Sequence, residues 1–266
     1  MFIIGEKINT TRKSIDAAVK ARDTAKIQQI AKVQEEAGAH SLDVNCGTVP
    51  ASEEPATMKW LVRTVQSVTD LPLCIDSANP EALEAGLEEH RGKPLVNSIS
   101  GENARYNKVL PLVKQYGAGI VALCNDDRGL PSSRQMAVDV GDTLVRRLMD
   151  DGIFLDDIYL DPLVRTLATS PETVVYTLEV MREFARRFPG LHLVSGLSNV
   201  SFGLPERRLL NRAFVAMSVA CGLDAVIADP LDGQLLSLIY ASEALVNKDR
   251  FCLKYINAYN AGKLSN

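Results

Sequence analysis

The sequence predicts an α/β protein that folds as a closed (β/α)8 barrel of the TIM type. Short apolar runs alternate with amphipathic helical patterns eight times along the 266 residues. The runs are apolar on both faces, as is typical of parallel strands covered by helices. The length matches the roughly 250 residues that such a barrel needs, so we expect residues 1–266 to form a single domain.

The first half of the chain contains four of these units. Strands are expected at residues 2–4, 41–45, 72–75 and 94–96, and helices at 23–37, 58–68, 80–89 and 102–116. Ile27 and Ala31 fall on one face of the first helix, and Gly38 ends it. Thr10 or Thr11 is a candidate cap for the structure that follows the first strand.

The second half repeats the pattern. Strands are expected at 119–124, 158–160, 191–194 and 224–228. Helices are expected at 132–151, 170–188, 208–220 and 233–245, with a short extra helix over 250–261. Ser170 and Pro171 give the second of these helices a strong N-terminal signal. An open doubly wound sheet is the alternative, but its glycine-rich turn is missing after the first strand, where Gly5 stands alone.

The composition is that of an ordinary globular enzyme, with 46% apolar and 23% charged residues and a net charge of −4. No basic tract is present, so no nucleic-acid partner is expected. No apolar run approaches the roughly 20 residues that span a bilayer, and no signal peptide follows Met1. We therefore expect a cytoplasmic protein without a membrane partner. The five cysteines form no CxxC pair, which favours buried, reduced thiols, with zinc ligation as the lesser alternative.

Polar side chains gather where the expected strands end, and barrel enzymes build their active sites there. The set consists of Glu6, Asn9, Asp43, Asn45, Asp76, Ser77, Asn97, Ser98, Asn125, Asp161, Ser198, Asn199 and Asp229. It is made of carboxylates, amides and hydroxyls and contains no histidine, because His40, His90 and His192 fall elsewhere. A histidine-based triad or a histidine-rich metal centre is not expected, and we predict no bound metal.

Such a set suits a flat heterocycle with amino, N–H and carbonyl groups along one edge, and a pterin has that edge. A divalent cation would also accept the carboxylates, but no phosphate-binding loop accompanies them. Any one Asp or Asn after a strand is often only a helix cap. Asp76, Asn97, Asp161 and Asn199 stand on four separate units, which favours a ligand site. Arg207 and its neighbour are either solvated charges or face an acidic ligand tail.

An ordered series of short motifs also resembles a known family. The motifs are Gly5-Glu6-Lys7-Ile8-Asn9, Leu42-Asp43-Val44-Asn45, Ile75-Asp76-Ser77, Asn97-Ser98, Asp161-Pro162, Gly196-Leu197-Ser198-Asn199-Val200-Ser201 and Ala220-Cys221-Gly222-Leu223-Asp224. Together they resemble the methyltetrahydrofolate:corrinoid-protein methyltransferases and the folate-binding module of cobalamin-dependent methionine synthase. The resemblance spans nearly the whole chain, and its most specific part is the motif after the seventh strand.

The resemblance implies a pterin-binding (β/α)8 barrel and roles for particular residues. Asp76, Asn97 and Asp161 would hold the pterin edge. Asn199 would contact N5, the nitrogen that carries the methyl group, and would be the catalytic residue. Gly196 and Ser198 belong to the same turn and are expected beside the pterin. Further pocket positions with less defined roles are Glu6, Asn9, Asp43, Asn45 and Arg207.

The resemblance also implies substrates and partners. The substrates would be methyltetrahydrofolate or tetrahydrofolate, and the methyl group would pass between N5 and the cobalt of a corrinoid. The sequence contains no Asp-x-His-x-x-Gly cobalamin-loop motif, so the corrinoid (cobalamin) is expected on a separate protein. The direction of transfer stays open. The resemblance further implies a homodimer working in one-carbon metabolism.

Three rival readings remain. A dihydropteroate synthase-like enzyme shares the barrel but carries a lysine near the seventh strand, where Asn199 stands here. A non-catalytic pterin-binding barrel is less consistent with the full set of polar residues. A metal-dependent or Schiff-base aldolase-like barrel would use a lysine, and Lys7 is the only lysine at an expected strand end.

Overall fold

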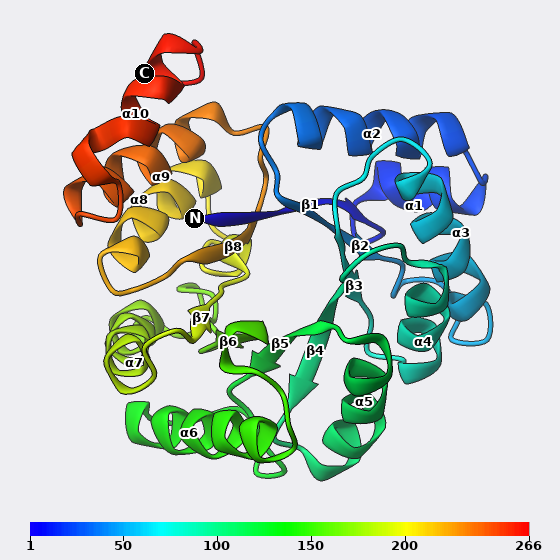
Figure 1. Ribbon diagram of the computed structural model, residues 1–266, viewed down its shortest axis with the longest axis horizontal. Helices are drawn as coiled ribbons and strands as arrows, with labels where there is room; N and C mark the ends of the chain where they lie inside the picture. The colour runs from blue at the N-terminus through cyan, green and yellow to red at the C-terminus, as the bar shows by residue number, and fades with distance from the viewer. Residues whose placement is uncertain (266) are drawn as a thin grey trace.

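Eight parallel strands curl into a barrel in the computed structural model, which describes residues 1–265 (Figure 1). They pair in the order β7-β6-β5-β4-β3-β2-β1-β8. Their bounds are β1 (Phe2–Asn9), β2 (Ser41–Asn45), β3 (Leu73–Asp76), β4 (Leu95–Ser100), β5 (Gly119–Leu123), β6 (Ile158–Asp161), β7 (His192–Leu193) and β8 (Ala225–Ala228). Between β7 and β8 the barrel is closed by single backbone bonds, such as Ile227 N–H to the Ser195 carbonyl at 3.0 Å. The predicted (β/α)8 barrel is confirmed.

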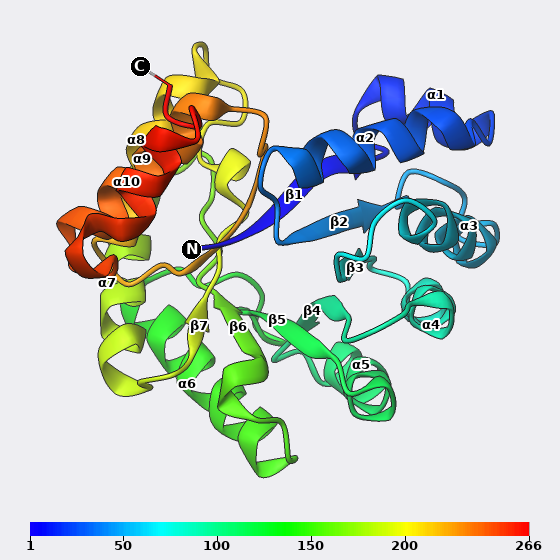
Figure 2. The ribbon, with the colours of Figure 1, turned by 45° about the horizontal axis from the view of Figure 1, so that its top comes forward.

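Helices surround the strands on the outer side of the barrel, as the second view makes clear (Figure 2). They are α1 (Lys13–Lys20), α2 (Thr24–Glu36), α3 (Glu54–Gln66), α4 (Pro80–Glu89), α5 (Asn103–Tyr116), α6 (Arg134–Asp150), α7 (Thr173–Arg187), α8 (Arg207–Val219), α9 (Gly233–Leu245) and α10 (Leu253–Asn260). Three short 3-10 turns are η1 (Leu155–Asp157), η2 (Leu197–Asn199) and η3 (Arg250–Cys252). Within residues 1–265, no helix has the length and apolar character needed to cross a membrane.

The first unit differs from the prediction in two ways. The first strand continues to Asn9 instead of ending at Ile4, and its pairing with β2 shifts register between Gly5 and Ile8. The helix α1 was not predicted from the sequence. It has eight residues, and its only buried side chains are Ile15, Ala18 and Val19. The predicted threonine caps are wrong, because the residue before α1 is Arg12 and its side chain makes no capping hydrogen bond.

The fourth strand is also longer than predicted. It runs to Ser100, and its pairing with β5 shifts register between Asn97 and Ile99. The peptide bond between Asn97 and Ser98 is cis. Asn97 therefore belongs to the strand itself and does not follow it. The predicted seventh strand is longer than the observed one, which contains only two residues.

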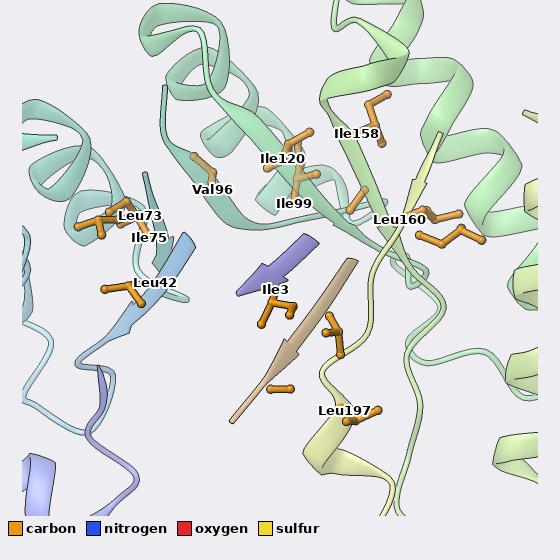
Figure 3. Packing of buried hydrophobic residues seen from close by; sticks show 14 of the residues in the cluster. Ile3, Leu42, Leu73, Ile75, Val96, Ile99, Ile120, Ile158, Leu160 and Leu197 are labelled. Carbon is orange, nitrogen blue, oxygen red and sulfur yellow. The ribbon is translucent and has the colours of Figure 1, made fainter. Parts of the chain in front are cut away.

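The apolar core has two layers on the two sides of the strands. Between strands and helices lies a large cluster that includes Leu42, Ile75 and Leu160 (Figure 3). Inside the barrel lies a smaller cluster that includes Ile4 and Val121. Because side chains alternate along a strand, residues of the strands contribute to both layers. The inner cluster fills the amino-terminal half of the barrel interior. The carboxyl ends of the strands are left for polar residues.

Candidate active site

A cavity of about 820 Å³ lies at the carboxyl ends of the strands. Its walls come from β1 to β6, from β8 and from the segments that follow β7 and β8. The residues to which the resemblance assigns a place in the site all line it, except Asn45: Glu6, Asn9, Asp43, Asp76, Asn97, Asp161, Gly196, Ser198, Asn199 and Arg207. Polar residues from widely separated parts of the chain are thus brought to one place, because parallel strands of a barrel all end on the same side.

Asn45 stands behind the cavity wall, so its predicted place in the pocket needs correction. Its side-chain amide donates a hydrogen bond to Asp76 Oδ2 at 2.8 Å, and its Oδ1 accepts from the Gly47 N–H at 2.9 Å. The two residues are register partners on β2 and β3. Asn45 therefore orients Asp76 from behind instead of facing the cavity.

Three carboxyl groups form the floor of the cavity, namely those of Asp43, Asp76 and Asp161. Asp43 is 2% exposed and Asp161 is 7% exposed. Burial raises the pKa of Asp76 to about 6, and it raises the pKa of Asp161 to about 6 as well. Burial, and then the neighbouring Asp76, raise the pKa of Asp43 well above its ordinary range. An acid in such a position is costly unless it is hydrogen-bonded or ion-paired. The neighbouring residues supply only some of the hydrogen bonds that these acids can accept.

The floor acids have few partners within residues 1–265. Asp161 accepts hydrogen bonds from the backbone N–H groups of Leu163, at 2.8 Å, and Gly196. Asp43 lies beside the Cys74 thiol and the Asn97 amide, but its Oδ1 has no hydrogen-bond partner. Such an unpaired oxygen in a buried position is costly unless a ligand donates to it.

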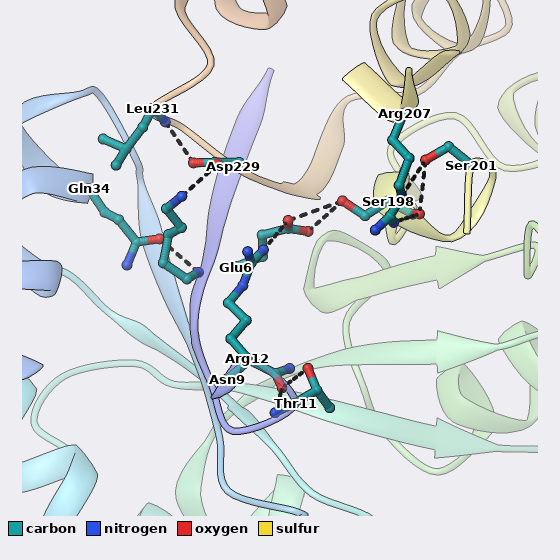
Figure 4. A network of polar contacts seen from close by, with 11 residues as sticks. Glu6, Asn9, Thr11, Arg12, Gln34, Ser198, Ser201, Arg207, Asp229 and Leu231 are labelled. Carbon is teal, nitrogen blue, oxygen red and sulfur yellow. Dashed lines mark hydrogen bonds and ion pairs between the residues drawn. The ribbon is translucent and has the colours of Figure 1, made fainter. Parts of the chain in front are cut away.

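The acids near the rim are paired in a different way (Figure 4). Lys7 Nζ lies 2.7 Å from Asp229 Oδ2, and an Arg12 Nη2 lies 2.6 Å from Glu6 Oε1. The Ser198 hydroxyl is 3.0 Å from both oxygens of Glu6. Burial raises the pKa of Glu6, and Arg12 opposes that rise. Lys7 is held in an ion pair, which argues against a free Schiff-base lysine.

The turn after β7 presents Asn199 to the cavity. A side chain at Gly196 would place its Cβ 3.0 Å from the Asn199 amide nitrogen and would displace this amide slightly. The side chain of Asn199 is exposed and has no hydrogen-bond partner within residues 1–265. Arg207 braces the turn by donating to the Ser198 carbonyl at 2.7 Å and the Ser201 hydroxyl at 3.1 Å. The amide is thus free to meet a ligand on a fixed backbone.

Several cavity residues were missed at the sequence level. Arg12, Asn211 and Phe202 all line the cavity, and Asn211 Oδ1 is buried without a partner. Arg208 lines it as well and makes no ion pair within residues 1–265. Asn211 and Arg208 lie three residues apart on α8, and residues at this spacing share a helix face. Helical spacing is therefore the signal that could have found Asn211.

Of the remaining polar candidates, Ser98 and Asp229 also line the cavity, whereas Ser77 and Asn125 do not. Ser77 donates its hydroxyl to Glu54 at 2.6 Å. Four cysteines are buried, as predicted, but Cys252 is exposed on η3 because that turn lies on the outer surface. Within the described residues, His, Cys, Asp and Glu side chains form no group of three that could hold a metal ion.

Comparisons with known proteins agree with this geometry. A family profile described as "Pterin binding enzyme" matches residues 5–229. The chain belongs to this family. It is 35% identical to a methylcorrinoid:tetrahydrofolate methyltransferase of Eubacterium limosum over 266 residues, which are 99% of this chain and 98% of the relative. It is also 33% identical to methionine synthase of Mycobacterium tuberculosis, over 85% of this chain but only 20% of that protein.

Solved structures of the pterin-binding enzyme family show the same fold. A dihydropteroate synthase from Xanthomonas albilineans, in complex with 7,8-dihydropteroate, aligns with a TM-score of 0.68 at 19% identity, covering 93% of this chain and 92% of that one. A dihydropteroate synthase of Yersinia pestis aligns with a TM-score of 0.67 at 16% identity, over 94% and 93% of the two chains. At these identities the likeness concerns the barrel and not the reaction.

Proposed function

We propose that this enzyme transfers a methyl group between N5 of tetrahydrofolate and the cobalt of a corrinoid carried by another protein. The observation that carries the proposal is the relative named as a methylcorrinoid:tetrahydrofolate methyltransferase, which matches over nearly the full length of both chains. Its name also favours the direction from the methylcorrinoid to tetrahydrofolate. The dihydropteroate synthases share only the fold at less than 20% identity, so they support no second candidate.

The cavity floor supports recognition of a pterin. A pterin edge presents several N–H donors side by side, and a carboxylate accepts two of them at once. Asp76 and Asp161 form no ion pair within residues 1–265 and would accept such donors. Asn97 lines the same floor and offers both a donor and an acceptor. Binding would thus supply the partners that these buried groups lack.

Asn199 supports the assignment of the reacting end. Methyl transfer from N5 to Co(I) breaks the N–CH3 bond, places the methyl group on cobalt and requires a proton at N5. In the opposite direction, N5 uses its electron pair to take the methyl group, loses its proton and leaves cobalt as Co(I). An amide can accept from a protonated N5 or donate to an unprotonated one. A side chain that assists proton movement in this way contributes typically about 10²–10⁴-fold.

The remaining parts of the proposal concern the surroundings of the reaction. In this proposal the corrinoid, which the relative's name gives as its methyl carrier, is carried by a separate protein that would meet the enzyme at the cavity mouth. Buried free cysteines are typical of a reducing compartment and support a cytoplasmic location. The homodimer implied by the resemblance is also part of the proposal.

A spectroscopic assay tests the proposed function in both directions. Methylcob(III)alamin with tetrahydrofolate should yield Co(I), and methyltetrahydrofolate with cob(I)alamin should consume it. The uncatalysed mixtures are the controls. An enzyme that binds methyltetrahydrofolate but changes neither spectrum, even with a corrinoid protein from an organism that uses one, would rule out methyl transfer.

A further inference from the structure

Arg105 occupies an unusual place for a cation. It lies in the first turn of α5, where the positive end of the helix dipole disfavours a positive side chain. Its guanidinium extends to the ends of two strands. Nε donates to the Ser98 carbonyl at 2.9 Å, Nη1 to the Ala78 carbonyl at 2.6 Å, and Nη2 to the Ser77 carbonyl at 2.8 Å. The cation is therefore placed for these contacts and not for the helix.

The three carbonyls adjoin two residues of the pterin site. Ser77 directly follows Asp76 at the end of β3, and Ser98 directly follows Asn97 on β4. A planar guanidinium can donate along three directions at once, whereas a lysine ammonium is a compact point donor. One side chain thus holds both strand ends at a fixed separation.

Arg105 also places a positive charge near Asp76. It is the cation that lowers the pKa of Asp76 against the larger effect of burial, and it forms no direct ion pair with that carboxylate. The other groups that act on Asp76 are Asn45, which also lowers the pKa, and Glu54, which raises it. Asp43 lies close enough for its own pKa to be raised by Asp76.

Arg105 itself stays outside the main cavity. It lines a smaller cavity of about 270 Å³, whose wall shares Asp76 and Ser98 with the main one. It therefore acts through Asp76 and Asn97 and does not itself meet the pterin.

We propose that Arg105 is a positioning residue for the pterin site, which fixes the strand ends carrying Asp76 and Asn97 and sets a positive charge beside Asp76. This inference rests on the proposed function, since it takes the pterin as the ligand. It predicts that Arg105 governs folate affinity and its pH dependence, while the methyl-transfer step at Asn199 is spared.

The test compares Arg105→Met, Arg105→Lys and a control, Arg91→Met. Arg91 also donates from its guanidinium to a backbone carbonyl, that of Gln66, but lies outside the cavity wall. The Kd for methyltetrahydrofolate is measured by calorimetry from pH 5.5 to 8, and KM and kcat with free cob(I)alamin. Arg105→Met should raise Kd and KM at least tenfold, change kcat less than threefold and move the pH midpoint of binding upward. Arg105→Lys should restore the midpoint more than the affinity, and Arg91→Met should resemble the wild type.

Wild-type Kd and pH midpoint in Arg105→Met would overturn the inference. An equal fall of kcat and affinity would do the same, because it would indicate general loss of active protein. If Arg105→Met does not fold, the result for Arg105→Lys decides. Wild-type folate affinity in Arg105→Lys would contradict the positioning role of Arg105, and a several-fold loss of affinity would support it. Failure of the wild type itself to bind methyltetrahydrofolate would instead reject the proposed function.

Discussion

The acidic groups at the amino-terminal end of the barrel are paired, whereas those on the floor of the cavity at the carboxyl end have no ion-pair partner within residues 1–265. At the amino-terminal end, His192 Nδ1 lies 2.8 Å from Asp224 and its Nε2 lies 3.2 Å from Asp156. The amino group of Met1 pairs with the buried Glu243 at the same end. On the cavity floor, Asp43 and Asp161 are buried and Asp76 is half-buried, and none of the three forms an ion pair within residues 1–265.

The difference shows which acidic groups lower the stability of the folded state. A paired acid contributes to folding or is nearly neutral, whereas a buried acid without a cation disfavours the folded state. Burial raises the pKa of Asp76 and of Asp161 for the same reason, because it disfavours the charged form of each group. Such groups therefore lie where a ligand can donate hydrogen bonds to them. Substitutions at the two ends of the barrel should for this reason have different effects.

The largest effect is expected from Asn199→Ala. The exposed amide contributes nothing to the core, so the fold and the folate affinity should persist, while methyl transfer falls by about 10²-fold through loss of hydrogen bonding at N5. Single-turnover kinetics with saturating folate and cob(I)alamin give the rate. A transfer rate within threefold of the wild type would remove Asn199 from the mechanism.

The next effect is expected in folate affinity from Asp76→Asn and Asp161→Asn. Each change turns one acceptor into a donor and removes a charge-assisted hydrogen bond, which is worth roughly 1.5–3 kcal/mol or about 10- to 100-fold in Kd. Calorimetry with methyltetrahydrofolate gives the value. Asp224→Asn, at the opposite end of the barrel, is the matched control and should leave Kd unchanged. Equal losses from all three substitutions would contradict the division between the ends.

A smaller effect is expected from pH. Folding raises the pKa of Asp76 and of Asp161 to about 6 each, so between about pH 4 and 6 the folded chain binds more protons than the unfolded one. These two groups should make the ligand-free enzyme more stable as the pH falls through 6, while folate affinity weakens over the same range. Thermal unfolding and calorimetry follow the two quantities. If the pH dependence of stability is unchanged in the Asp76→Asn, Asp161→Asn double variant, groups other than these two cause it.

The smallest effect concerns His192→Gln at the amino-terminal end. The hydrogen bond to Asp224 raises the pKa of His192, so its stabilising effect is fully present below the unfolded value of about 6.5 and is lost as pH rises through the folded value. The variant should unfold about 1–2 kcal/mol more easily at pH 6 and lose less at pH 8, with folate affinity unchanged. Denaturant titrations at both pH values measure the difference, and altered affinity would show that the two ends are coupled.

Much of this arrangement was predictable because it depends on strand ends. Asp76, Asp161 and Asn199 were placed correctly in one cavity, since parallel strands of a barrel end on the same side. Asn45 was misplaced because the sequence does not show that its amide turns towards Asp76. The strand β1 is longer than predicted, because Glu6 and Lys7 interrupt its apolar pattern and hide its continuation.

Other features left little or no signal in the sequence. The helix α1 buries only three side chains, too few for a clear helical period. Arg105 binds carbonyls that are 7, 27 and 28 residues away, and no local pattern reports such contacts. Its position in a first helical turn was the one available hint.

The measurement that tests the central claim most directly is proton release on ligand binding. Methyltetrahydrofolate is titrated into the wild-type enzyme by calorimetry at pH 6 and pH 8, in buffers of different ionisation enthalpy. If pterin N–H groups complete Asp76 and Asp161, binding lowers the pKa of both carboxyl groups from about 6, so protons should be released at pH 6 and not at pH 8. Binding without proton release at pH 6, or no binding at all, would contradict the claim that Asp76 and Asp161 accept hydrogen bonds from the pterin.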